Sequence, residues 1–380
     1  MASHISRSAR AVGCLIGGAV GDALGAQIEF LDLNEIRRQY GSRGVLTLEP
    51  TAFGLARITD DTQMTMFTAE GLLEMRTRER FQPASLTADD GSADRTRMHP
   101  VLGAYHRWLV TQGSRPETGP GTLYAGLGER SVSEVLSAGQ LVHVPRLHAR
   151  REPGNTCLES LQTGVHMTPD HPQNNSKGCG GVMRAAPAGI IAADPVTAFR
   201  LGCRLAALTH GHPTGYIAAG FLALMIALLM DEEDIVRSAE QAVAAARDPA
   251  LFEGAATAAG NPGEETARAL EQAMELAASG APATPETVQR LGAGWVAEEV
   301  LAIGLYAALA SPHDLPAAVQ LAVNHSGDSD STGSICGNIV GAFVGAAGIP
   351  AAFCRELELR PEIRRLAIGL NDARGLTAEG

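Results

Sequence analysis

Apolar runs separated by short polar stretches dominate this chain of 380 residues. The runs are rich in alanine and leucine, and they rarely alternate between apolar and polar residues as β-strands do. The pairs Asp194-Pro195 and Thr284-Pro285 are typical of an N-cap followed by the first residue of a helix. The pattern therefore predicts an all-α protein with many helices.

One apolar run, YIAAGFLALMIALLM, spans residues 216–230. A helix that crosses a bilayer needs about 20 apolar residues, so this run is too short to span comfortably. We interpret it as a fully buried core helix and expect no membrane partner.

Glycine recurs at every fourth position in two distant segments. On a helix this spacing places all the glycines on one stripe, where a second backbone can approach closely. Because each glycine costs about 1 kcal/mol in a helix interior, packing between the two helices is the expected compensation. The N-terminal and C-terminal helices should therefore meet within a single domain. The glycines are Gly13, Gly17, Gly21 and Gly25 in the first segment, and Gly337, Gly341 and Gly345 in the second.

Three further segments carry polar or turn-forming residues without a clear helical period. We expect them to be surface excursions from one domain that covers residues 1–380, and not linkers between domains. They are residues 82–97, 149–177 and 246–265.

Composition and charge restrict the class of protein. Hydrophobic residues make up 45% of the chain, which is typical of a globular protein, and the net charge is −12. This charge argues against nucleic acid or an anionic membrane as the main partner. The six cysteines form no CxxC pair, as expected for a reducing compartment. We therefore expect a cytoplasmic protein, and we expect it to be a monomer.

Two polar islands stand between apolar stretches, and each contains two acids. Each island has an ordinary explanation, because acids stabilise the first turn of a helix and Asp and Ser side chains stabilise loops. The islands are ITDDTQMTM, residues 58–66, with Asp60 and Asp61, and NHSGDSDSTGS, residues 324–334, with Asp328 and Asp330.

The two islands together favour a metal site. Four carboxylates at one place repel strongly, and neither island contains a Lys or Arg. Carboxylate and hydroxyl oxygens are the ligands of hard cations such as Mg²⁺, Mn²⁺ and Ca²⁺. Four carboxylates exceed what one Mg²⁺ usually takes, so the islands predict a two-metal site.

Five segments resemble, in chain order, the signature segments of the ADP-ribosylglycohydrolases. The resemblance extends over nearly the whole chain. The segments are GCLIGGAVGDALGAQIEF (13–30), ITDDTQMTM (58–66), GCGGVMRAAPAGI (178–190), LTHGHPTGYIAAG (208–220) and NHSGDSDSTGSICGNIVGA (324–342).

The resemblance implies a single-domain orthogonal helical bundle with two Mg²⁺ or Mn²⁺ ions in a central cleft. Two departures stand out: Ser331 replaces the usual threonine, and Cys179 replaces the usual asparagine. The implied metal ligands are Thr59, Asp60, Asp61, Asp328, Asp330 and Ser331; Glu29 falls on the acid that approaches the metals or substrate, and Gly180, Gly181 and His210 line the ADP-ribose cleft.

The resemblance further implies a glycosidase that cleaves the C1″ bond between ADP-ribose and a modified protein side chain, with an ADP-ribosylated protein as partner and ADP-ribose as product. The acceptor residue remains open between arginine, serine and others. Two alternatives also remain: a hydrolase of a free ADP-ribosylated small molecule, and a non-catalytic protein that binds ADP-ribose. The candidates for the general base are Glu29, Asp60, Asp61 and Asp328.

Overall fold

The computed structural model describes residues 5–50, 54–81, 92–232, 234–248, 251 and 262–374, and within these ranges the secondary structure is helical, with isolated bridges but no sheet. This confirms the predicted all-α class. The α-helices are α1 (Arg7–Gly25), α2 (Leu33–Tyr40), α3 (Asp60–Phe81), α4 (Ser92–Thr111), α5 (Glu129–Leu136), α6 (Asn155–Gln162), α7 (Ala186–Ile191), α8 (Pro195–Ala207), α9 (Pro213–Asp231), α10 (Ile235–Ala246), α11 (Glu264–Ala278), α12 (Pro285–Val288), α13 (Ala297–Ala310), α14 (Leu315–Val323), α15 (Ser329–Val344), α16 (Ala351–Glu356) and α17 (Arg360–Asp372).

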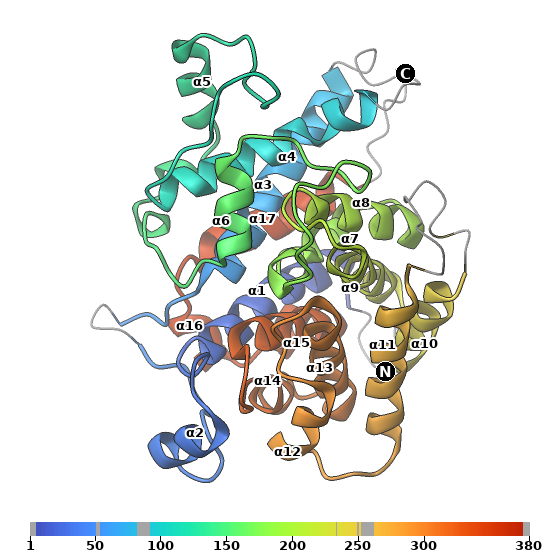
Figure 1. Ribbon diagram of the computed structural model, residues 1–380. Helices are drawn as coiled ribbons and strands as arrows, with labels where there is room; N and C mark the ends of the chain where they lie inside the picture. The colour runs from blue at the N-terminus through green and yellow to red at the C-terminus, as the bar shows by residue number, and fades with distance from the viewer. Residues whose placement is uncertain are drawn as a thin grey trace.

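Helices α1 and α15 pack backbone to backbone at the centre of the protein (Figure 1). A Cβ atom on Gly17 would overlap the carbonyl oxygen of Gly337, and one on Gly21 would overlap that of Gly333. The contacts run in opposite chain directions, so the C-terminal end of α1 lies against the N-terminal end of α15. The predicted meeting of the two glycine-rich helices is confirmed.

Helix α9 is the apolar core helix. Its length and composition would allow it to cross a membrane, but 89% of its most apolar 18-residue segment is buried inside the protein. Helices α7, α8 and α13 pack around it. The apolar run at 216–230 therefore belongs to the protein core, as its length predicted.

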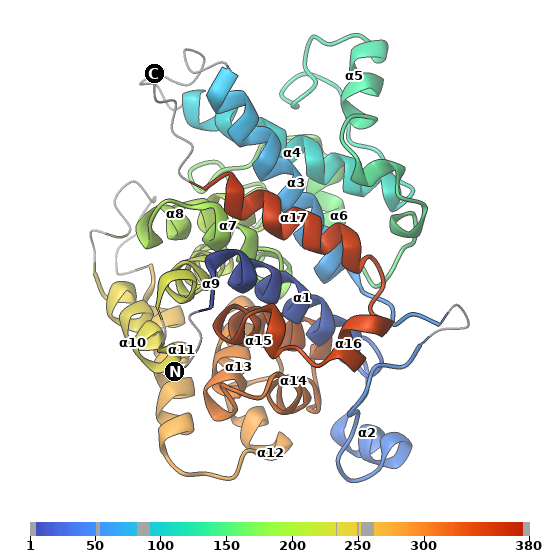
Figure 2. The same cartoon turned by 180° about the vertical axis from the view of Figure 1, so that it is seen from behind.

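A second group of helices covers the other side of α1. Figure 2 shows α17 lying across α1 and α3, and both contacts are present in the structure. Helix α3 also packs along α4. This arrangement fixes α3 next to α1, so the first turn of α3 can reach the end of α1.

The three expected excursions differ in structure. In the first, residues 82–91 lie outside the described residues, and 92–97 belong to the start of α4. In the third, 252–261 lie outside them, while α10 ends at Ala246 and α11 begins at Glu264. The middle segment, 149–177, contains α6, and its Cys157 is buried in the main core.

Candidate active site

Asp22 near the end of α1 holds the start of α3. Its carboxylate accepts hydrogen bonds from the backbone N–H groups of Thr59 (3.0 Å) and Thr62 (3.1 Å) and from both hydroxyls, at 2.8 and 2.5 Å. The side chain is completely buried. Asp22 therefore stabilises the N-terminus of α3, whose first N–H groups have no partner within the helix.

The first acid pair, Asp60 and Asp61, begins α3. Both side chains are buried, with exposed fractions of 4% and 2%. Asp60 accepts a hydrogen bond from the N–H of Gly154 (3.3 Å), whereas Asp61 Oδ1 is buried and has no hydrogen-bond partner among the residues that the structure describes. A buried carboxylate oxygen without a partner is costly, so this oxygen points to a ligand that the side chain would bind.

The second acid pair lies at the N-terminus of α15. Asp328 is the N-cap, and its side chain accepts the N–H of Ser331 at 3.2 Å. The thiol of Cys179 donates to Asp328 Oδ2 at 2.8 Å. Asp330 accepts the same Ser331 N–H at 2.9 Å, and all three of these α15 residues are 2% exposed.

The glycine seam between α1 and α15 brings the two pairs together. A Cβ on Gly25 would overlap the backbone of Ser329 and Asp330, so the end of α1 touches the first turn of α15. Asp22, three residues before Gly25, holds α3 at the same place. Both predicted acid islands therefore converge on one site, together with Asp22.

Within the described residues, none of these acids has an ion pair with Lys, Arg or His. Burial and the negative charge of Asp330 raise the pKa of Asp22 to about 7, and the same two causes raise the pKa of Asp60, Asp61 and Asp328 well above the usual range. Burial also raises the pKa of Asp330 itself. Asp330 therefore lies at the centre of the cluster.

Glu29, four residues beyond the end of α1, joins the same cluster. Its side chain is buried, and Oε2 has no hydrogen-bond partner. Burial, followed by the charges of Asp330, Asp328 and Asp60, raises its pKa to about 10. The structure thus places Glu29 beside the aspartates.

The donor set fits hard divalent cations. It consists of buried carboxylates, a threonine hydroxyl and a serine hydroxyl. Among the residues that the structure describes, two of the carboxylate oxygens have no hydrogen-bond partner, and no basic side chain lies within ion-pair distance. In the part of the chain that the structure describes, no group of three His, Cys, Asp or Glu side chains is placed closely enough to hold a metal ion as it stands. The acids therefore lie together at one site, but their side chains do not form a complete set of ligands around one metal position.

The glycine-rich loop 178–181 lies against the second acid pair. Cys179 at its tip reaches Asp328, and its N–H donates to the carbonyl oxygen of Trp295 at 3.2 Å. A Cβ on Gly178 or Gly180 would lie 3.5 Å from Nε2 of His210. The sequence-predicted residues of the ADP-ribose cleft therefore lie together, next to the acids.

Two exposed aromatic side chains stand near these elements. Phe30 directly follows Glu29, and Trp295 is the residue whose carbonyl holds Cys179. Their rings stack with centroids 6.1 Å apart and an interplanar angle of 19°. The pair therefore links the segment that carries Glu29 with the loop beside Cys179.

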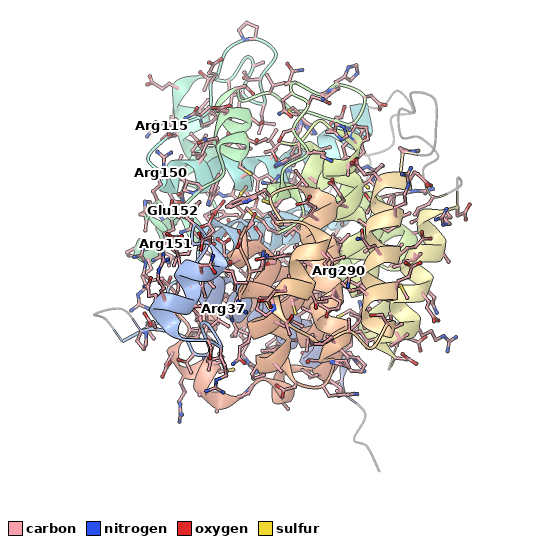
Figure 3. All side chains as sticks on the ribbon, turned by 60° about the horizontal axis from the view of Figure 1, so that its bottom comes forward. Arg37, Arg115, Arg150, Arg151, Glu152 and Arg290 are labelled. Atoms are coloured by element: carbon pink, nitrogen blue, oxygen red, sulfur yellow. The ribbon has the colours of Figure 1, made fainter. Side chains whose placement is uncertain are left out.

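A recess of about 360 Å³ opens beside Thr59. Gln27, Glu49, Arg57 and Glu152 contribute to its lining. In Figure 3, Glu152 lies with its neighbours Arg150 and Arg151 in one column at the edge of the molecule. The recess gives solvent access to the α3 side of the acid cluster.

Two residues of the site have no role in the sequence prediction. Asp22 lies inside an apolar, glycine-rich run, and its partners are 37 and 40 residues away. Arg184 is completely buried and donates to Thr209 beside His210. A single acid within an apolar helix is the only signal that could have indicated Asp22.

Comparisons with known proteins agree with this architecture. The ADP-ribosylglycohydrolase family matches residues 3–379. An uncharacterised protein of Archaeoglobus fulgidus is 27% identical over 94% of each chain, and the ADP-ribosyl-[dinitrogen reductase] glycohydrolase of Rhodospirillum rubrum is 24% identical over 97% of each chain. A solved ADP-ribosylglycohydrolase-related protein complex shares the fold with a TM-score of 0.59 at 24% identity, covering 97% of this chain and 99% of that one. The chain belongs to the ADP-ribosylglycohydrolase family.

Proposed function

We propose that the protein is a metal-dependent ADP-ribosylhydrolase that cleaves the C1″ glycosidic bond between ADP-ribose and a modified protein side chain. The observation that carries this proposal is the convergence of Glu29, Asp60, Asp61, Asp328 and Asp330 without a basic partner within the described residues. Membership of a glycohydrolase family supports glycosidic chemistry at this cluster.

Two Mg²⁺ or Mn²⁺ ions fit the oxygen-rich donor set. Thr59, Asp60, Asp61, Asp328, Asp330 and Ser331 are the residues that would hold them. When bound, such ions acidify water and fix neighbouring hydroxyl groups of a substrate. Asp22 would keep the hydroxyl of Thr59 oriented, because its carboxylate already accepts a hydrogen bond from that hydroxyl at 2.8 Å.

Glu29 is the proposed general base. It lies among the acids, yet Oε2 has no hydrogen-bond partner in the described part of the chain, so this oxygen can accept a proton from the attacking water. Burial is the main cause of its raised pKa, and repulsion by Asp330, Asp328 and Asp60 adds to it; once cations neutralise these aspartates, the second contribution falls. The transition state of the cleaved sugar would resemble an oxocarbenium ion, as in other glycoside hydrolyses.

The loop 178–181 and His210 are proposed to bind the rest of the ADP-ribose. Gly180 and Gly181 donate no backbone hydrogen bond within the described residues, so their N–H groups are available for an anionic ligand. Because this loop contacts Asp328 through Cys179, a ligand on the loop would extend directly into the acid cluster.

The test is a release assay on peptides ADP-ribosylated at one defined residue each, with a free ADP-ribosylated small molecule in parallel. We expect release of ADP-ribose from at least one peptide with Mg²⁺ or Mn²⁺, and none with EDTA. Full activity after exhaustive chelation would contradict metal dependence. Release from the free conjugate alone would contradict a protein substrate.

A further inference from the structure

Arg184 is a buried cation that the chemistry described so far does not use. It lies in the segment between the glycine-rich loop and α7, and none of its side chain is exposed. Among the described residues it has no carboxylate partner; its guanidinium lies over the ring of Tyr105, 4.4 Å from the centroid. A buried charge without a counter-ion is costly, so its hydrogen bonds need an explanation.

The shortest of these hydrogen bonds leads towards the cleft. Arg184 Nη2 donates to the hydroxyl of Thr209 at 2.6 Å, and this hydroxyl lies 2.8 Å from Nδ1 of His210. Because a guanidinium can only donate, the Thr209 oxygen accepts here and keeps one proton of its own to donate.

The geometry decides where that proton goes. Two other acceptors lie near the hydroxyl. The carbonyl oxygen of Ala206, at 3.4 Å, is beyond the usual range of an O–H···O hydrogen bond, and the sulfur of Cys157 is only a weak acceptor. The Thr209 hydroxyl therefore donates to Nδ1 of His210. A neutral imidazole that accepts at Nδ1 carries its proton on Nε2.

Nε2 faces the glycine-rich loop and has no partner of its own among the described residues. A Cβ on Gly178 or Gly180 would lie 3.5 Å from Nε2, so at these two positions only backbone lies against this edge of the ring. The ring is 1% exposed. Burial and the charge of Arg184 lower the pKa of His210 to about 3, in agreement with a neutral ring.

We propose that Arg184 and Thr209 are positioning residues that fix His210 as the Nε2–H tautomer, so that it donates a hydrogen bond to an acceptor oxygen of ADP-ribose on the glycine-rich loop. This inference rests on the proposed function, because it takes ADP-ribose as the ligand of the loop. The buried arginine then has a purpose: its charge strengthens the donor chain Arg184–Thr209–His210, which ends at the ligand.

The tautomer can be measured without any ligand. In the full-length protein labelled with ¹⁵N-histidine, a long-range ¹H–¹⁵N spectrum at neutral pH distinguishes protonated from unprotonated ring nitrogens, and the spectrum of His210→Gln assigns the signals. We expect Nε2 protonated and Nδ1 unprotonated. A protonated Nδ1 would overturn the proposal.

Binding of ADP-ribose then tests the role of the tautomer. Thr209→Val removes the hydroxyl at nearly the same size, whereas Thr209→Ser keeps it and is the matched control. We expect Thr209→Val to mix the tautomers and to weaken ADP-ribose binding about two- to fivefold, in proportion to the lost Nε2–H fraction, and Thr209→Ser to behave as the wild type. Equal affinity and equal tautomer populations in the two variants would overturn the proposal.

The two hypotheses fail separately. If the wild type does not bind ADP-ribose, the proposed function fails, while the ligand-free spectrum still decides the tautomer. If Thr209→Val does not fold, the wild-type spectrum alone accepts or rejects the Nε2–H state.

Discussion

Buried carboxylates occur in two regions of this protein, and they differ in how their charge is compensated. Outside the site, Glu358 pairs with Arg151, and Glu70 shares Arg107 with Glu74. Glu70 also accepts two backbone N–H groups from the loop after α5, at 2.8 and 2.9 Å. Each of these acids has a structural partner within the described residues.

The acids of the site lack such partners, although they are buried to the same degree. Asp60, Asp61, Asp328 and Asp330 are 2–4% exposed, against 4% for Glu358 and 8% for Glu70. Two of the cluster's carboxylate oxygens, one each on Asp61 and Glu29, have no hydrogen-bond partner among the described residues. This fold provides an arginine to buried acids at two other places. Because no arginine of the described residues pairs with the acids of the site, we infer that a ligand compensates their negative charge.

The largest expected effect is on turnover. Asp330→Asn keeps the shape of the central acid and removes its charge. We expect the rate of ADP-ribose release to fall at least about 1000-fold, since changes outside the ligand shell alone typically cost 10- to 100-fold. Without metal, the variant should unfold at a higher temperature than the wild type, because the acids repel less.

The matched control is Asp194→Asn. Like Asp330, Asp194 accepts a backbone N–H at the start of a helix, that of Thr197 at 2.9 Å, but it is the N-cap of α8 and lies on an exposed surface. Asparagine caps helices about as well as aspartate, so activity and stability should stay unchanged. Full activity of Asp330→Asn would show that the central acid serves only the fold.

The opposite result is expected at the compensated acids. Arg107→Met leaves Glu70 and Glu74 without their cation and should lower the free energy of unfolding by about 3 kcal/mol or more. Activity per folded molecule should not change. Urea unfolding measures the first quantity, and the release assay the second.

An exposed pair serves as its control. Arg130 and Glu134 form an ion pair on α5 with side chains 92% and 65% exposed, and such pairs contribute little. Arg130→Met should therefore unfold at the same urea concentration as the wild type. A loss of activity in Arg107→Met, at unchanged stability, would contradict the distinction between acids that serve the fold and acids that serve the site.

The metal-free protein should become less stable as the pH rises. The unfolded acids titrate near pH 4, whereas the folded pKa of Asp22 is about 7 and that of Glu29 is about 10. Between these pH values the folded state binds more protons than the unfolded state. The contribution of these two groups to the free energy of unfolding is therefore fully present below pH 4. The contribution of Asp22 is lost as the pH rises to 7, and that of Glu29 as it rises to 10.

Cations should reverse this trend. Mn²⁺ at 100 times its Kd should stabilise the protein by about 2.7 kcal/mol, and the gain should grow with pH because the ligands must be deprotonated. Melting temperatures in EDTA and in Mn²⁺ between pH 5 and 8 measure both effects. Parallel pH profiles with and without Mn²⁺ would contradict a metal site at these acids.

The sequence predicts the site where the signal is local, and it fails where the signal depends on distant contacts. The four-residue glycine spacing is a helical pattern, so the seam between α1 and α15 could be predicted, and with it the convergence of the acid islands. Asp22 and Arg184 could not. Asp22 contacts a helix start 37 residues later, and Arg184 contacts Thr209, so neither function leaves a periodic pattern.

The compensated acids were equally hidden. Arg151 and Glu358 are 207 residues apart, and nothing near either residue indicates the other. From the sequence alone, all buried acids look alike, whether or not they have a cation. The four aspartates of the two islands could be predicted because they are clustered along the chain, which structural ion pairs do not require.

The smallest expected effect concerns the seam that brings the uncompensated acids together. In Gly337→Ala, the new Cβ would overlap the carbonyl oxygen of Gly17 on α1. Overpacking of this kind typically costs about 1–3 kcal/mol, because neither backbone can move without shifting a whole helix.

Gly103→Ala is the matched control: Gly103 lies inside α4, and the nearest atom to its Cβ would be 3.7 Å away. There alanine meets no obstacle and should stabilise the helix by about 0.5–1 kcal/mol. Urea unfolding of both variants should therefore give shifts of opposite sign; shifts of the same sign would mean that the close approach of α1 and α15 does not hold the acid cluster together.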